Sequence, residues 1–156
     1  MGIRAHLPGA GLCFLAAAQL AVADPVANGN DMALNYFRAA PEAKAQVQKE
    51  AAGKLHVFRF LSVSEPVAAE TNRPVVVTIE PSSGLTVEVV VSGKLSRNIA
   101  STLSTGECVA VQGRVVSVGV AAPDRIVVDP AVILHKDRRQ PKAGAELLHE
   151  VNPKAH

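Results

Sequence analysis

Tryptophan is absent from this sequence, and aromatic residues supply only 3% of its 156 positions. Hydrophobic residues nevertheless make up 48% of the chain, which is enough for one ordinary domain of roughly 100–150 residues. The core must therefore be built from Val, Leu, Ile and Ala. Such a core favours β-sheet over a helical bundle, because β-branched side chains suit a pleated surface.

Cysteine is almost as scarce, with only Cys13 and Cys108 in the sequence. Cys13 lies in an N-terminal segment that we expect to be removed, so the mature chain would hold Cys108 alone and form no internal disulfide. Cys108 begins an apolar segment and has no nearby His or basic residue in the sequence. We therefore interpret it as a small buried hydrophobic residue rather than a nucleophile.

The sequence also lacks a strong charge and any catalytic signature. Its formal net charge is +2, well short of the concentrated positive field that binding to a phosphate backbone usually requires. It contains no G-x-S-x-G, no H-E-x-x-H and no glycine-rich phosphate loop. His56, His135, His149 and His156 show no paired spacing for a metal. We expect no catalytic residue, no metal site and no enzyme activity.

The first 23 residues have the form of an export signal. Arg4 precedes an uncharged apolar stretch over residues 7–23 that ends in Ala21-Val22-Ala23, an A-x-A cleavage site. We predict cleavage after Ala23 and an exported protein, periplasmic or extracellular, with no membrane span left. A retained anchor is the alternative, but a spanning helix needs about 20 apolar residues, and Pro8 interrupts this stretch early.

A helical arm follows the signal. Two pieces are predicted, from Asp31 as the cap to Ala39 and from Pro41 to Ala52, with Gly53 as the stop. The second piece offers a weak apolar face, so docking on the rest of the protein and a mobile arm stay open as alternatives. If the arm docks, we expect the adjacent Tyr36 and Phe37 to hold it.

Five short segments rich in β-branched residues follow the arm, and Gly, Pro, Asn and Ser punctuate them. This pattern is typical of a small closed or nearly closed β-structure. The predicted strands are Leu55 to Val63, Val75 to Glu80, Leu85 to Ser92, Cys108 to Val118 and Arg125 to His135.

The residues between and within these strands predict their connections. Pro81-Ser82-Ser83-Gly84 has Pro and Gly placed for a tight hairpin turn. Asn98 to Leu103 suits a short helix with Asn98 as its cap. Gly113 indicates a bulge or sharp bend in the fourth strand, and Pro130 indicates an edge or a bulge in the last.

Strand, strand, strand, short helix, strand, strand is the element order of the OB-fold. We therefore predict a mainly β protein, a five-stranded OB-like Greek-key barrel with an N-terminal helical arm and a short helix between strands 3 and 4. The predicted organisation is a signal peptide at 1–23, the arm at 24–53, the barrel at 54–136 and a polar tail at 137–156. A generic small β-sandwich is the alternative.

Within the barrel region the chain resembles the bacterial OB-fold group called tRNA-anti-like. The resemblance rests on Val75-Val76-Val77-Thr78-Ile79, Leu85-Thr86-Val87-Glu88-Val89, the segment from Gly106 to Val115 and the segment from Ile126 to Ile133. These segments form a barrel pattern more than a diagnostic motif. The resemblance therefore implies the fold and says little about the ligand.

The first strand supplies the candidate contact surface. Leu55, Val57, Leu61 and Val63 fall on one face, with Arg59 as an exception, and that face is the better core candidate. The opposite face carries His56, Phe58 and Phe60. Either the arm covers the two Phe side chains, or they form an exposed stacking surface. We interpret this face as the binding site for an envelope protein or a small ligand.

Single-stranded nucleic acid is a less favoured ligand. OB-folds that bind it place aromatic and basic side chains over their second and third strands. Here those two strands contain no aromatic residue, no Lys and no Arg, while Glu80 and Glu88 would repel phosphate.

His135, just after the last strand, is a further candidate. His135-Lys136-Asp137 resembles the haem-attachment region of the haem chaperone of cytochrome c maturation, an exported OB-fold whose His follows the barrel. The chain departs from that pattern because Lys136 separates His from Asp and no Tyr follows in the tail. We expect no cofactor, with haem at His135 as the alternative.

Overall fold

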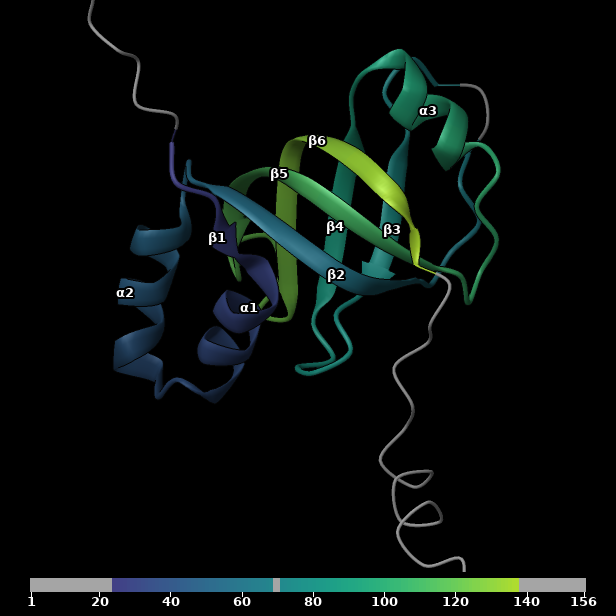
Figure 1. The fold of residues 1–156 in the computed structure, drawn as a ribbon. Helices are drawn as coiled ribbons and strands as arrows, with labels where there is room; N and C mark the ends of the chain where they lie inside the picture. Colours follow the sequence, from purple (N-terminus) through teal and green to yellow (C-terminus); the bar gives the residue numbers. More distant parts are fainter. Residues whose placement is uncertain (1–23, 69–70, 138–156) are drawn as a thin grey trace, which may run out of the picture.

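The structure, a computed structural model, describes residues 24–68 and 71–137. Its strands belong to one mixed sheet in the order β1-β2-β3-β4-β6-β5, and β2 also pairs with β5 (Figure 1). The strands are β1 (Ala27–Asn28), β2 (Leu55–Val63), β3 (Val75–Ile79), β4 (Thr86–Val91), β5 (Cys108–Val118) and β6 (Arg125–Asp137). The helices are α1 (Gly29–Arg38), α2 (Pro41–Ala51) and α3 (Lys94–Ala100).

Five of these strands close into a ring. The β3–β4 pair is an antiparallel hairpin, β4 runs parallel to β6, and β6 pairs antiparallel with β5. Strand β2 pairs antiparallel with both β3 and β5, which completes the circle. This is the connectivity of the predicted OB-like barrel, which is confirmed, and the alternative of a two-sheet sandwich is wrong.

The predicted strand boundaries hold to within two residues, the largest difference being that β6 continues to Asp137, so His135 lies inside this strand and not after it. Two short elements differ from the prediction. The two-residue strand β1, parallel to β2, was missed because two residues show no periodicity. The short helix begins at Lys94 instead of Asn98, because Gly93 adopts a positive φ of 82° and turns the chain directly after β4. Of the two alternatives predicted for Pro130, the edge is wrong, because β6 is paired on both sides, and the bulge is confirmed, because the β4–β6 register shifts between Val128 and Ala131.

The prediction of a bulge at Gly113 is confirmed. The β5–β6 register shifts between Gly113 and Val115. A Cβ atom at Gly113 would lie 2.5 Å from Val128 Cγ1 and 2.7 Å from the Pro130 carbonyl oxygen. Two strands approach each other here more closely than a side chain allows, which is a use that only glycine serves in a strand interior.

The barrel interior is aliphatic, as the composition predicts. The fully buried side chains of β3, β4 and β6 include Val76, Val87, Val89 and Val128. Phe58 is the largest fully buried side chain among the described residues. It lies where β2 faces the arm, so the interior packs against the arm at this point.

The helical arm docks on the barrel (Figure 1). Asn28, rather than the predicted Asp31, caps α1, because its side chain accepts hydrogen bonds from the backbone N–H groups of Asn30 and Asp31. Tyr36 is buried in the common core, whereas Phe37 is 55% exposed. The prediction that both aromatic residues hold the arm is therefore right for Tyr36 and wrong for Phe37.

Gly29 provides a test of this docking. A Cβ atom there would lie 2.6 Å from the Phe58 ring, so we expect Gly29→Ala to lower the free energy of unfolding by about 1–3 kcal/mol through overpacking. In an undocked helix the same change would stabilise by up to about 1 kcal/mol. Urea unfolding distinguishes the two signs. In a Phe58→Leu background the loss should shrink, and an unchanged loss would contradict the contact.

Candidate functional site

A β-bulge in β2 places two successive side chains, Arg59 and Phe60, on one surface. Phe58 pairs with Val111 of β5, and Leu61 pairs with Val109. Between these two pairs β2 contains two residues and β5 contains one, which is the definition of a β-bulge. Phe58 and Leu61 are both fully buried. The two residues between them, Arg59 and Phe60, lie on the outer side, where Arg59 is exposed and Phe60 half-buried. Re-aiming a side chain in this way is a common use of bulges.

The bulge corrects the predicted faces of this strand. Before it, His56 and Phe58 point inward and are 3% and 0% exposed, so the predicted core face is wrong there. After it, Leu61 and Val63 are inside as predicted. Of the three residues proposed as one contact surface, His56 and Phe58 stay together on the inner side, with ring centroids 6.3 Å apart, and Phe60 alone is separated from them. The arm covers Phe58, the first of the two alternatives, and of the three only Phe60 reaches the pocket described below.

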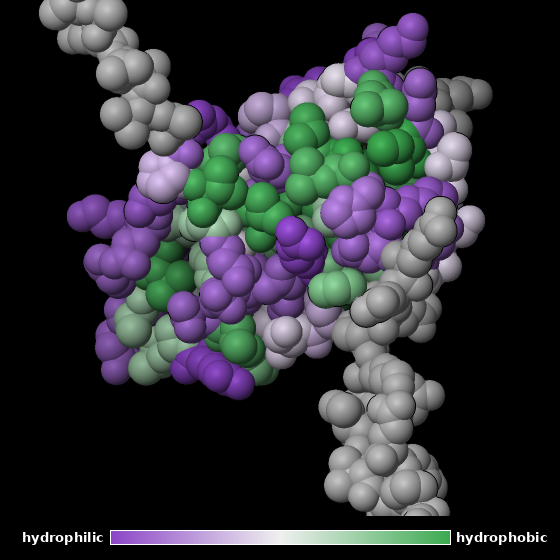
Figure 2. All heavy atoms as spheres, viewed as in Figure 1, coloured by the Kyte–Doolittle hydropathy of each residue, from purple (hydrophilic) through white to green (hydrophobic). Residues whose placement is uncertain are grey.

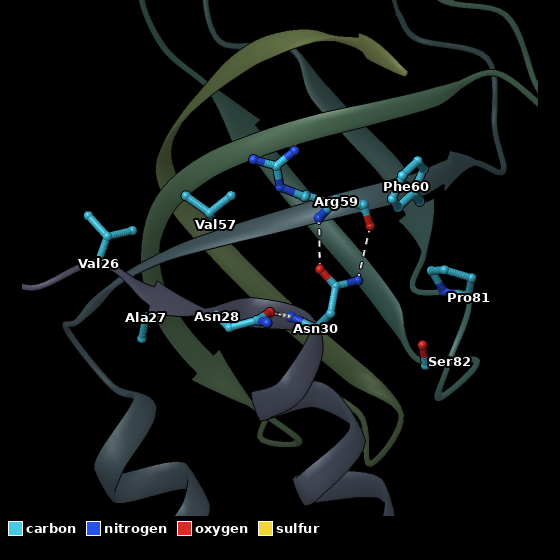
Figure 3. Close-up of a pocket in the computed structure, with 9 residues that line it drawn as sticks. All are labelled: Val26, Ala27, Asn28, Asn30, Val57, Arg59, Phe60, Pro81 and Ser82. Carbon is cyan, nitrogen blue, oxygen red and sulfur yellow. Dashed lines mark hydrogen bonds between the residues drawn. The ribbon is translucent and has the colours of Figure 1, made fainter. Parts of the chain in front are cut away.

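Asn30 of α1 stabilises the bulge from the side. Its Oδ1 accepts the Arg59 N–H at 2.8 Å, and its Nδ2 donates to the Arg59 carbonyl oxygen at 3.0 Å (Figure 3). Asp137 Oδ2 accepts the Phe60 N–H at 2.9 Å. Phe60 has a positive φ of 56°, a conformation that bulky residues rarely adopt. These bonds satisfy polar groups that the irregular strand leaves without ladder partners.

A buried carboxylate extends this network. Glu80 is 0% exposed and accepts hydrogen bonds from Asn30 Nδ2 at 2.8 Å and from the Ser83 N–H at 2.7 Å. Burial alone would raise the pKa of Glu80, but the hydrogen bonds from Ser83 and Asn30 outweigh it and lower the pKa. The expectation that Glu80 repels phosphate on the outer face is therefore wrong. Glu88 does face outward, where it pairs with Arg125 at 2.8 Å.

An open pocket of about 680 Å³ lies beside the bulge, within the size range of small-molecule sites. Figure 3 shows Val26 and Val57 on one side, Phe60, Pro81 and Ser82 on the other, and the Arg59 side chain above. Ala27, Asn28 and Asn30 complete the lining. Within the part of the chain that the structure describes, no hydrogen bond or ion pair engages the Arg59 guanidinium.

His135 lies in a separate, polar pocket of about 860 Å³. Its Nε2 is 2.9 Å from Asp137 Oδ1, and Lys136 pairs with Glu107 at 3.2 Å nearby. These charged walls differ from the apolar and aromatic lining that holds large flat ligands, so the surroundings of His135 argue against haem. Across residues 24–68 and 71–137 there is no cluster of His, Cys, Asp or Glu suited to a metal ion.

Cys108 occupies the same pocket but is 5% exposed. Burial, with a smaller effect of Asp137, raises the pKa of its thiol. A thiol of this kind is protonated at neutral pH and is a poor nucleophile. Its burial fits the small hydrophobic role expected from the sequence.

Several predicted features lie outside the described residues, namely the signal peptide at 1–23, His149, His156 and all of the polar tail except Asp137. Within the described segments, no helix has the length and hydrophobicity to cross a membrane.

Comparisons with known proteins identify no relative that would fix the ligand. No family model matches the chain, and no curated protein matches it. Among solved structures it is similar to a protein assigned as an aspartyl-tRNA synthetase of Leishmania major Friedlin, with 12% identity and a TM-score of 0.41. The match covers 80% of this chain and 23% of the other. At this similarity it carries no argument about function, which must come from the site itself.

The network around Glu80 predicts a pH-dependent stability. Because its folded-state pKa is lowered, its contribution is fully present above the ordinary pKa of a glutamate and is lost as the pH falls through the lowered value. Glu80→Gln would set an amide N–H against Asn30 or Ser83 and should cost about 1–3 kcal/mol at pH 7. Urea unfolding from pH 7 to pH 3 should show a weaker acid dependence in the variant, and parallel curves would contradict this role.

The conformation of Phe60 predicts an inverted ranking of two substitutions. In an ordinary strand Gly is less stable than Ala by about 0.5–1 kcal/mol. At the positive φ of residue 60 we expect Phe60→Gly to be more stable than Phe60→Ala by about 1 kcal/mol, because only Ala retains the Cβ clash. Thermal unfolding of the pair measures this difference. The ordinary ranking would show that residue 60 is not held in the left-handed region.

Proposed function

We propose that this protein is an exported, non-enzymatic binding module of the tRNA-anti-like OB-fold group. It holds a small ligand in the pocket of about 680 Å³ beside the bulge, which we call the Arg59–Phe60 pocket. The observation that carries the proposal is the bulge, which turns Phe60 from the barrel interior to the pocket. Export rests on the signal-like first 23 residues, and the absence of activity rests on the missing catalytic motifs.

The energetic cost of the bulge supports a functional role. A bulky residue in a sparsely populated backbone conformation costs on the order of 1–3 kcal/mol and persists where its surroundings fix it. Here Asn30 and Asp137 supply those fixing bonds. A regular strand would instead have left Phe60 on the inner face, beside Phe58. The chain thus holds an aromatic ring at a pocket at the expense of a regular strand.

The outer surface leaves the two other candidates as alternatives. On the face seen in Figure 2, hydrophobic residues gather in an oblique band across the upper half of the molecule, and an apolar patch of this kind is a feature of protein-docking sites. The β3–β4 face where OB-folds bind oligonucleotides carries Glu88 and no basic or aromatic residue of those two strands. The envelope protein and single-stranded nucleic acid are therefore alternatives.

A fragment screen tests the proposed site. We expect backbone amide shifts in a ¹H–¹⁵N correlation spectrum to change at pocket residues such as Val57 and Ser82 when small aromatic fragments are added. Phe60→Ala should weaken these fragments about tenfold or more, since stacking on an aromatic side chain contributes about 1–3 kcal/mol. Phe37→Ala removes a more exposed ring elsewhere, 55% exposed on α1, and should change nothing. Fragments that collect on the β3–β4 face, or none at all, would refute the site.

A further inference from the structure

We propose that the Arg59–Phe60 pocket selects small organic anions with a flat apolar body, such as aromatic carboxylates. This rests on the proposed function and adds the chemical class of the ligand. Two features of the pocket support this proposal. The first is that the Arg59 guanidinium has no internal partner among the described residues, and the second is the arrangement of the apolar side chains that line the pocket.

Arg59 is the only charged residue among those that line the pocket in the described part of the chain. Its carboxylate neighbours are already engaged. Glu80 is buried and accepts hydrogen bonds from Asn30 and Ser83, and the two oxygens of Asp137 are taken by the Phe60 N–H and by His135. The Arg59 guanidinium is therefore available to an external anion, and its planar fork matches a carboxylate in a bidentate pair.

The availability of the Arg59 guanidinium distinguishes it from three other described arginines, which pair with acidic side chains. Arg73 pairs with Asp129, Arg114 with Asp24 and Arg125 with Glu88. Each of these guanidinium groups would have to give up an internal partner to bind a ligand. Arg59 would not, and it stands beside an aromatic ring and a pocket, which the other three do not line.

The walls of the pocket suit a flat apolar body. Phe60 and Pro81 lie on one side, and Val26 and Val57 face them from the other (Figure 3). A ring between them would stack on Phe60 in an offset or edge-on arrangement. The two asparagine side chains that line the pocket already form internal hydrogen bonds, because Asn28 caps α1 and Asn30 binds the backbone of Arg59 at the bulge. Ser82 is left as a further hydroxyl at the rim.

The test uses three probes that separate charge from shape, namely 2-naphthoate, its neutral amide 2-naphthamide, and the non-aromatic cyclohexanecarboxylate. Each is titrated into the purified protein at pH 7 and followed by backbone amide shifts at the pocket. We expect 2-naphthoate to bind about tenfold or more tightly than either of the others, because a hydrogen bond to a charged group contributes about 1.5–3 kcal/mol.

Variants assign the two contributions. Arg59→Gln should remove the preference for 2-naphthoate over 2-naphthamide while leaving the affinity for the amide unchanged. Phe60→Ala should weaken both aromatic probes alike. Arg38→Gln and Phe37→Ala, which alter an exposed Arg and an exposed Phe of α1, are the matched controls and should leave all three affinities unchanged.

The outcomes separate this inference from the proposed function. Equal, Phe60-dependent binding of 2-naphthoate and 2-naphthamide would overturn the anion class and leave the small-ligand pocket standing. No shift at the pocket with any probe would overturn both. A hexathymidylate that binds the same residues more tightly than 2-naphthoate, with a steep salt dependence, would replace the small anion by single-stranded nucleic acid.

Discussion

The side chain of Asn30 connects the parts of this protein that give the candidate site its shape. One amide group joins the backbone of Arg59 in β2 to the buried carboxylate of Glu80 at the end of β3. Because both Nδ2 hydrogens and the Oδ1 atom are used, the start of α1, the bulge and the β3–β4 turn form one polar unit beside an aliphatic core. Because Glu80 is fully buried, its carboxylate would be costly to leave without these hydrogen bonds, so the unit fixes the geometry of all three elements.

The barrel could be predicted from the sequence because its strands are marked by local chemistry. Runs of Val and Ile, the Pro81–Gly84 turn and the glycine at 113 each indicate structure within a few residues, and together they give the OB-like order. The bulge could not be predicted in this way. It contains no glycine, and the atoms that stabilise it come from Asn30 and Asp137, which lie far from Phe60 in the sequence.

One signal of the bulge was nevertheless present. Arg59 was the exception on an otherwise apolar face of the strand, and an exception of this kind marks the point where the alternation changes phase. Phe58 and Leu61, three residues apart, are both large and apolar, which a regular period of two would place on opposite faces. Two inward residues separated by two outward ones are what a bulge produces. An exception in a strand pattern is thus better interpreted as a register change than as noise.

The arrangement also explains why this fold and its usual binding surface are separable here. The barrel needs only inward-facing aliphatic residues from β3, β4 and β6, so its outer β3–β4 face is free to vary, and in this chain it carries Glu88 paired with Arg125. The N-terminal arm adds β1, which pairs with β2, and Asn30 of α1. Both contribute to the lining of the pocket, so a barrel without the arm would lack it. A regular strand would place Phe60 inside the barrel, bury more of its ring and avoid the positive φ. Packing of the core alone therefore does not explain why Phe60 lies outside. The ring stays outside because Asn30 and Asp137 hold it there, and that makes the pocket, rather than the usual face, the place where binding should be sought.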